Sequence, residues 1–152
     1  MAAAAANRLR DPSRPAIVVD AGTAITVDCL SSTGVFLGGA ILPGMRMAAG
    51  ALDRHTDKLP LVDTSQLDAP PPIGRNTQAA ISSGVYWGAV GAVERMCEEF
   101  RAVLGSAPQL YLTGGDAPRL ALRFADARHV PHLVLAGIAL AAQRLTEKGN
   151  GP

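Results

Sequence analysis

The sequence predicts a single α/β domain in which strands come first and strands alternate with helices afterwards. Its 152 residues suit one compact domain, and hydrophobic residues make up 48% of them, which is enough for a core. Three short apolar runs separated by turns fill residues 16–42, whereas residues 76–104 repeat apolar side chains at steps of three and four. A strand-rich first third and one long helix follow from these patterns.

The chain is expected to begin in a helix. Residues 1–7 are mostly alanine, the strongest helix former, and the basic residues that follow favour the C-terminal end of a helix. The two prolines of residues 11–15 then exclude further helix. We therefore separate residues 1–15, the tail of a helix plus a linker, from a domain at residues 16–148.

Strands are expected at residues 16–19, 24–30 and 35–42. The first is a short apolar run that ends at Asp20, and the second is rich in β-branched residues. Because only short turns join these runs, they predict a three-stranded antiparallel meander.

A helix is expected at residues 45–54, followed by a proline-rich loop at residues 59–73. The long periodic helix then starts with Asn76 or Thr77 as its N-cap and stops at Gly105. Units of strand and helix are expected after it: a strand at 109–113, a helix at 117–124, an edge strand at 129–130 and a helix at 133–145.

Composition argues against several classes of partner. The formal net charge is +1 and no basic run occurs, so nothing points to nucleic acid or to an anionic membrane surface. No apolar stretch reaches the ~18 residues that a membrane helix needs, and the start does not resemble a secretory signal. Cys29 and Cys97 lie far apart without metal-binding spacing, which indicates reduced, buried thiols in a cytoplasmic protein.

Residues 20–28 (DAGTAITVD) end a strand in an acid and turn on Gly-Thr, a pattern suited to phosphate chemistry. Gly22 lets the main chain approach an anion closely, and the Thr23 hydroxyl can donate to phosphate oxygens. The Asp20 carboxylate can hold a cation beside those phosphates. The alternative is an ordinary hairpin in which Asp20 and Thr23 cap the turn.

Three further motifs combine glycines with polar residues. Residues 38–44 (GGAILPG) let a strand pass tightly under a ligand or helix, or form a simple glycine bulge and turn. Residues 74–77 (GRNT) open the long helix, where Thr77 contacts a ligand or merely assists capping. Residues 113–116 (TGGD) form a close-approach turn, or a plain strand-to-helix connection with Asp116 as N-cap.

In order and spacing the four motifs resemble those of the type III pantothenate kinases, which carry DxGTAxTxD, GGxIxPG and GxNT segments and a glycine turn under the adenosine. The resemblance covers residues 16 to about 140. It implies the C-terminal half-domain of the actin-like ATPase (ribonuclease H-like) superfold. It also implies an ATP-dependent transfer of phosphate to pantothenate, the first step of coenzyme A biosynthesis.

The resemblance further implies the ligands of individual residues. ATP with its Mg²⁺ would contact Gly22, Thr23, Gly114 and Gly115. Asp20 would bind a monovalent cation, K⁺ or NH₄⁺, and Thr77 would contact pantothenate.

Two family motifs, DxGNT and GxDR, do not occur in these 152 residues. In the family, the Asp of GxDR deprotonates the pantothenate hydroxyl, and GxDR opens the alanine-rich helix that precedes DxGTA. Because the chain begins inside that helix, we expect this Asp upstream of Met1. The Asp53–Arg54 pair stands in the wrong place to replace it. Losing a general base costs roughly 10²–10⁴-fold, so the isolated chain is expected to be inactive. A truncated chain, a degraded paralogue and a chain that works with a separately made first half all remain open.

The helix at residues 77–104 predicts a homodimer. No charged residue occurs from Gln78 to Ala92, and this stretch is rich in Ala, Ser and Gly, which permit close approach of a second helix. The resemblance places the substrate site near such an interface, where Thr77 would serve the neighbouring subunit. A non-catalytic module akin to a transcription accessory factor is the alternative function. A sugar- or acetate-type kinase of the same superfold is a third, which the GGxIxPG and GxNT segments argue against.

Overall fold

The computed structural model describes residues 1–65 and 67–149. Its five strands are β1 (Ala16–Ala21), β2 (Ala24–Leu30), β3 (Phe36–Pro43), β4 (Gln109–Thr113) and β5 (Ala127–His129). Its five helices are α1 (Ala2–Leu9), α2 (Met45–Arg54), α3 (Thr77–Leu104), α4 (Ala117–Ala121) and α5 (Leu133–Gly149). None of these helices is long and apolar enough to cross a lipid bilayer.

The strands form one mixed sheet in the order β3-β2-β1-β4-β5. β1, β2 and β3 pair antiparallel, whereas β4 runs parallel to β1 and β5 runs parallel to β4. This antiparallel meander followed by βα units confirms the predicted arrangement of strands and helices. Because β1 is central and its apolar side chains are buried on both faces, its C-terminal end can present functional groups from a rigid base.

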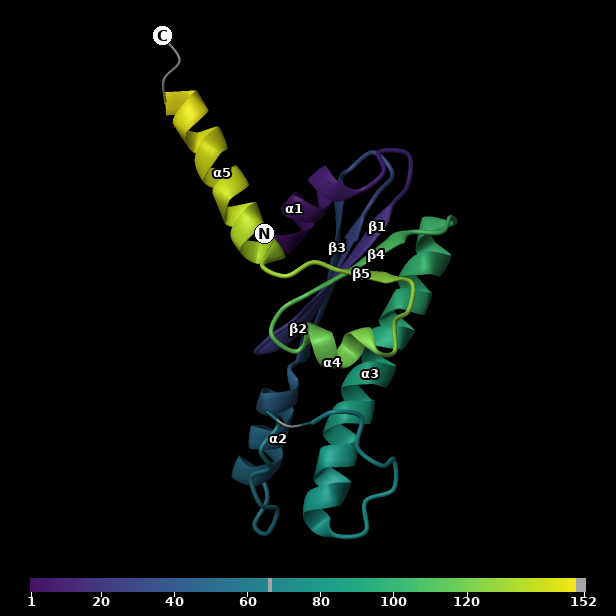
Figure 1. Ribbon diagram of the computed structural model, residues 1–152, viewed down its shortest axis with the longest axis vertical. Helices are drawn as coiled ribbons and strands as arrows, with labels where there is room; N and C mark the ends of the chain where they lie inside the picture. The colour runs from purple at the N-terminus through teal and green to yellow at the C-terminus, as the bar shows by residue number, and fades with distance from the viewer. Residues whose placement is uncertain (66, 150–152) are drawn as a thin grey trace.

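Helices cover both faces of the sheet, with α3 on one side and α1 and α5 on the other (Figure 1), and a hydrophobic core lies on each face. On one face, Val19 and Val27 pack with Tyr86 and Val93 of α3. On the other, the alanines of α1 pack with Val18, Tyr111 and the start of α5. The predicted layered domain is therefore built from alternate residues of the same strands.

The linker after α1 is held by a buried arginine. Arg10 is 9% exposed, and its Nε donates to the side chain of Asn7 at 2.6 Å. Its Nη1 donates to main-chain carbonyls of the linker and to the carbonyl of Ser32 at 2.9 Å. The guanidinium thus joins the end of α1, the linker and the β2–β3 turn without a carboxylate partner among the described residues.

The predicted ends of α3 are confirmed. The Asn76 side chain accepts a hydrogen bond from the Ala79 amide at 2.9 Å, which satisfies one of the free amides of the first turn. Gly105 ends the helix with a φ of 62°, a left-handed conformation that glycine adopts without strain.

Two helices differ from the sequence-based expectation. α4 ends at Ala121 instead of residue 124, because the amides of Arg123 and Phe124 bond to carbonyls three residues back and close turns rather than α-helix. α5 continues to Gly149 instead of residue 145. The short edge strand lies at Ala127–His129, slightly earlier than expected.

Candidate functional site

Three of the four motifs meet at the C-terminal end of β1. The main-chain carbonyl of Ala21 accepts a hydrogen bond from the Asp116 amide at 2.9 Å. The carbonyl of Thr23 accepts one from the Gly44 amide at 3.1 Å. The turn at residues 21–23 is therefore bonded on one side to the β3–α2 turn and on the other to the β4–α4 turn.

Two glycines make this contact possible. A Cβ atom on Gly44 would overlap the carbonyl oxygens of Gly22 and Thr23. A Cβ atom on Gly114 would overlap the Ala21 carbonyl, and Gly114 also has a φ of 96°, which side chains rarely tolerate. The main chains approach too closely for any other residue, so the glycines of the second and fourth motifs set the geometry of the first.

The bonded turns form one side of a cleft of about 540 Å³. Gly22 and Thr23 line it from the β1–β2 turn, and Gly115 and Asp116 line it from the β4–α4 turn. The loop between α2 and α3 supplies a third side through residues 63–65. The lining thus offers main-chain groups, hydroxyls and carboxylates around one hollow.

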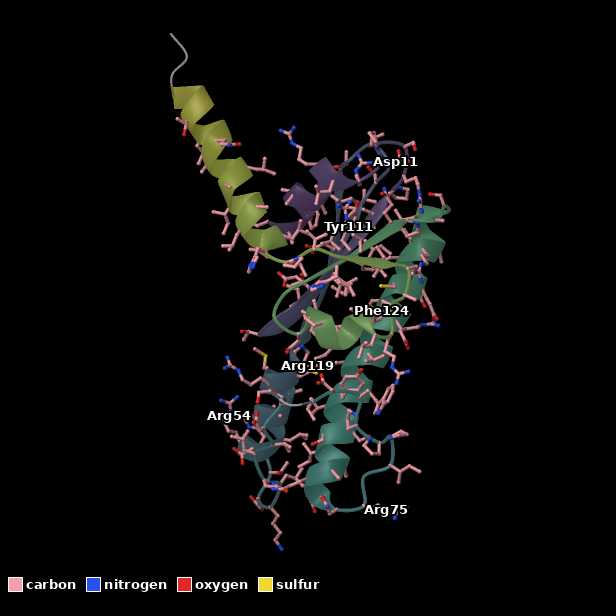
Figure 2. The ribbon with its side chains drawn as sticks, in the orientation of Figure 1. Asp11, Arg54, Arg75, Tyr111, Arg119 and Phe124 are labelled. Atoms are coloured by element: carbon pink, nitrogen blue, oxygen red, sulfur yellow. The ribbon has the colours of Figure 1, made fainter. Side chains whose placement is uncertain are left out.

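Two arginines also line the cleft, and sequence reasoning missed both. Arg46 stands in the first turn of α2, directly after the Gly44 contact, and it makes no ion pair with any described residue. Arg119 projects from α4 near the middle of the molecule (Figure 2). Arg46 could have been singled out from the sequence, because it stands two residues after the GGAILPG motif, at the expected start of a helix. The α2–α3 loop gave no comparable signal, because it lacks periodicity.

Asp20 lies beneath the glycine turns. Its Oδ1 is so near Gly114 that a Cβ there would overlap it, and it does not line the cleft of residues 63–65. Partial burial raises the pKa of the Asp20 carboxyl above its usual range. No described arginine or lysine pairs with this carboxylate, so its donor chemistry fits a bound cation.

Asp28 lies on the same face of the sheet as Asp20. In the antiparallel register Asp20 pairs with Thr26, which is two residues from Asp28. Burial is the main cause that raises the pKa of the Asp28 carboxyl, and the neighbouring charge of Asp20 adds to it. Both acids of the first motif are therefore costly to ionise in the folded chain.

A second cavity, of about 560 Å³, lies on the other side of the Gly114–Gly115 turn. His129, His132 and Leu135 are among its lining residues. Thr113 is buried and its hydroxyl accepts a hydrogen bond from the Leu133 amide at 3.3 Å, so this residue anchors the start of α5. The glycine turn thus separates a polar cleft from a more apolar one.

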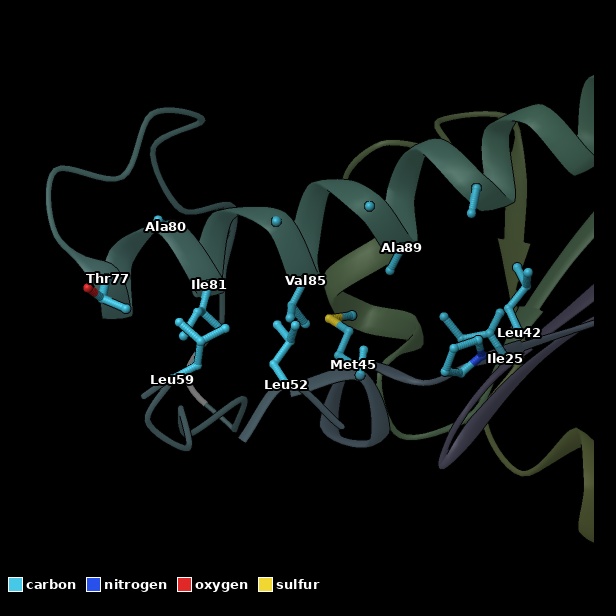
Figure 3. Close-up of a pocket in the computed structure, with 15 residues that line it drawn as sticks. Ile25, Leu42, Met45, Leu52, Leu59, Thr77, Ala80, Ile81, Val85 and Ala89 are labelled. Carbon is cyan, nitrogen blue, oxygen red and sulfur yellow. The ribbon is translucent and has the colours of Figure 1, made fainter. Parts of the chain in front are cut away.

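Thr77 does not join the other predicted site residues. It is the first residue of α3. Figure 2 labels Arg75, two residues earlier, at the opposite end of α3 from the part near Arg119. It borders an apolar groove of about 560 Å³ between α2 and α3 (Figure 3). Leu59 faces Ile81 across this groove, and Leu52 faces Val85. The structure therefore brings together Asp20, Gly22, Thr23, Gly114 and Gly115, and leaves Thr77 apart.

The two glycines of the β4–α4 turn are expected to respond differently to alanine. Gly114→Ala should destabilise the fold by at least about 1–2 kcal/mol, because its backbone is left-handed and its Cβ would overlap Ala21. Gly115→Ala meets open space and should change stability by less than about 0.5 kcal/mol. Urea denaturation of both variants measures this difference. Equal losses would contradict the close contact.

The partly buried acids predict a pH dependence of stability. A carboxyl with a raised folded pKa binds its proton more tightly in the folded chain, so ionisation lowers stability as the pH rises. Asp28→Asn should therefore stabilise the protein at pH 7, and the gain should fade as the pH falls through the raised folded pKa and be gone below the ordinary carboxyl pKa of 3.8. Thermal unfolding across this pH range checks the sign. The exposed Asp57→Asn serves as control, and a gain that does not depend on pH would refute the explanation.

Comparison with known proteins agrees with this arrangement. A family model of the type III pantothenate kinases matches residues 1–99. The type III pantothenate kinase of Anaeromyxobacter sp. (strain Fw109-5) is 43% identical over 129 residues, which is 84% of this chain and 50% of that protein. That of Rhodopirellula baltica is 45% identical over 131 residues, covering 82% of this chain and 46% of that protein. The chain spans about half the length of these relatives.

A solved structure shares the fold. A protein from Campylobacter jejuni, described as a conserved Baf family transcriptional activator, superimposes with a TM-score of 0.65 at 28% identity. The match covers 95% of this chain and 63% of that one. The residues that the family model matches include the first three motifs, the strands β1, β2 and β3, and the start of α3. On this evidence the chain belongs to the type III pantothenate kinase family.

Proposed function

We propose that this chain is the nucleotide-binding C-terminal half of a pantothenate kinase, and that it holds the phosphates of ATP between its two glycine turns. The observation that carries the proposal is the direct bonding of the 21–23 turn to the Gly115–Asp116 turn beside one polar cleft. Amides and hydroxyls of such turns bind phosphate oxygens. Phosphoryl transfer depends mainly on this kind of positioning and charge neutralisation.

Arg46 supports a negatively charged ligand. A cation in the first turn of a helix is unfavourable by about 0.3–1 kcal/mol, because the helix N-terminus is itself positive. α2 has no acidic residue in its first turn to offset Arg46. A phosphate group in the cleft would satisfy the guanidinium and the free amides of α2 together.

The remaining parts of the nucleotide fit around the same turns. The cavity bordered by His129, His132 and Leu135 would receive the adenosine, on the less polar side of Gly114 and Gly115. Asp20 would hold a monovalent cation, K⁺ or NH₄⁺, which would relieve the cost of its ionisation. Mg²⁺ would accompany the ATP phosphates in the cleft.

Pantothenate would bind near Thr77, in a dimer. Thr77 is nine residues before Tyr86, whose hydroxyl donates to the Arg119 carbonyl beside the cleft. At 1.5 Å per residue this separates Thr77 from the cleft level by about 13 Å, too far for direct transfer within one subunit. Thr77 would therefore serve the cleft of a second copy, across an interface made by α3.

The isolated chain would not complete the reaction. Its 152 residues contain neither the DxGNT loop nor the GxDR segment of the family. Without the general base and the other side of the cleft, we expect nucleotide binding without turnover. We place the protein in the cytoplasm, where ATP and pantothenate are available.

A nucleotide titration tests the proposal. Calorimetry with ATP and Mg²⁺ should give a weak dissociation constant, about 1 mM, because one half of the cleft is lacking. Arg46→Ala should weaken binding about tenfold, since a charge-assisted hydrogen bond contributes about 1.5–3 kcal/mol. Arg54→Ala, at the exposed end of the same helix, is the matched control and should leave binding unchanged. An absence of binding, or equal effects of the two variants, would refute the nucleotide site.

A non-catalytic accessory role is the second candidate. The similarity to a protein described as a transcriptional activator favours it. A chain with this role would keep the fold and would show no affinity for ATP, so the same titration separates the two functions.

The dimer has its own test. Gly84 and Gly88 face open space, so a leucine at either position should be tolerated by the single chain. Gly88→Leu should nevertheless convert the dimer to a monomer, because its side chain would block the close approach of a second α3. Light scattering after size exclusion measures the mass. A wild-type monomer at tens of micromolar would exclude the interface, and Glu98→Ala on the charged part of α3 is the control.

A further inference from the structure

One guanidinium joins two segments that lie far apart in the sequence. Arg119 forms an ion pair with Asp116 on its own turn, and its Nη2 donates to the Ser65 carbonyl in the α2–α3 loop. Its Nε lies 3.7 Å from the Asp68 carboxylate of the same loop. The Arg119 and Asp116 side chains are each only 22% exposed, so this ion pair is shielded from water more than an ordinary surface pair, whereas Asp68 is 76% exposed.

The loop segment that Arg119 holds has a defined shape. Asp63 accepts hydrogen bonds from the Ser65 amide at 2.8 Å and from the Ser65 hydroxyl at 2.9 Å. The Leu67 amide bonds to the Thr64 carbonyl at 3.3 Å, and the Leu67 side chain is buried in the core. Residues 63–65 are therefore held close to Leu67, which fixes this part of the loop in the core, and Arg119 fixes its exposed end at Ser65.

Helix α3 fixes the position of Arg119 itself. The Tyr86 hydroxyl donates to the Arg119 carbonyl at 3.2 Å. Trp87, the next residue of α3, donates its Nε1 hydrogen to the Pro70 carbonyl at 2.9 Å and stacks against Arg123. α3 thus fixes α4 through Tyr86 and the later part of the loop through Trp87. The Arg119 guanidinium then joins α4 to the earlier part of the loop at Ser65.

We propose that Arg119 is a positioning residue that latches the loop residues 63–65, 67 and 68 onto the Gly115–Asp116 turn and so builds the third wall of the cleft. Two consequences follow for a phosphate ligand, whose identity rests on the proposed function. The latch brings Thr64 and Ser65 beside Thr23 and Gly115. It also neutralises Asp116, whose free charge would repel phosphates at close range.

Without the Arg119 guanidinium, Ser65 and Asp68 would lose their contacts with α4. The Ser65 carbonyl would lack a donor, and the carboxylates of Asp68 and Asp116 would repel each other across the gap. Lysine at position 119 would keep the charge but could not reproduce three contacts in a planar fork. An intermediate effect of lysine is therefore a signature of the latch.

Two measurements on the whole chain test the proposal: amide hydrogen exchange of the ligand-free protein and calorimetry with ATP and Mg²⁺. In Arg119→Gln we expect the Ser65 and Leu67 amides to exchange at least tenfold faster, while α3 and β4 keep their protection. The ATP dissociation constant should rise about tenfold. Arg119→Lys should give smaller changes in both. The control is Arg101→Gln, which removes an exposed arginine–aspartate pair with Asp126 and should change neither.

The outcomes are distinguishable from those of the nucleotide proposal. Unchanged exchange at Ser65 and Leu67 in Arg119→Gln overturns the latch, whatever the chain binds. Faster exchange in a protein that binds no ATP supports the latch and refutes the nucleotide site. If Arg119→Gln loses its native circular dichroism, Arg119→Lys carries the comparison, and unchanged exchange in that variant overturns the proposal.

Discussion

The candidate site depends on the close contact of three main-chain turns at the end of β1. The Ala21 and Thr23 carbonyls accept hydrogen bonds from turns that begin two other elements, α4 and α2. This contact exists only because Gly44 and Gly114 carry no side chain. The glycine motifs thus form one site, although they follow different strands of the sheet, which has the order β3-β2-β1-β4-β5.

Much of this architecture is predictable from the sequence, because periodicity and turn residues are local signals. The predicted bounds of β2, α2 and β4 match the structure, as do the caps of α3. Arg119 and the turn at residues 63–65 were not predictable as site components. Their contact spans 54 residues and depends on how α3 places α4, which no local pattern encodes. The apolar pattern also did not predict the early end of α4, where the amides of Arg123 and Phe124 bond to carbonyls three residues back.

α3 relates the two regions that ligands would occupy. One side of this helix packs on the sheet, another borders the groove with α2, and Tyr86 and Trp87 hold α4 and the α2–α3 loop. Because a helix of 28 residues is stiff, the cleft and the Thr77 end keep a fixed separation. A neighbouring molecule that displaced α3 would also shift Arg119, because the Tyr86 hydroxyl is bonded to the Arg119 carbonyl.

The outer strand β3 has a consequence for the colloidal behaviour of the chain. Phe36 and Leu37 are more than half exposed, Ile41 is 78% exposed, and no described strand pairs with the outer side of β3. Unpaired amides and carbonyls beside apolar side chains form a template for strand addition. We therefore expect strand addition at this edge to limit the solubility of the chain at high protein concentration.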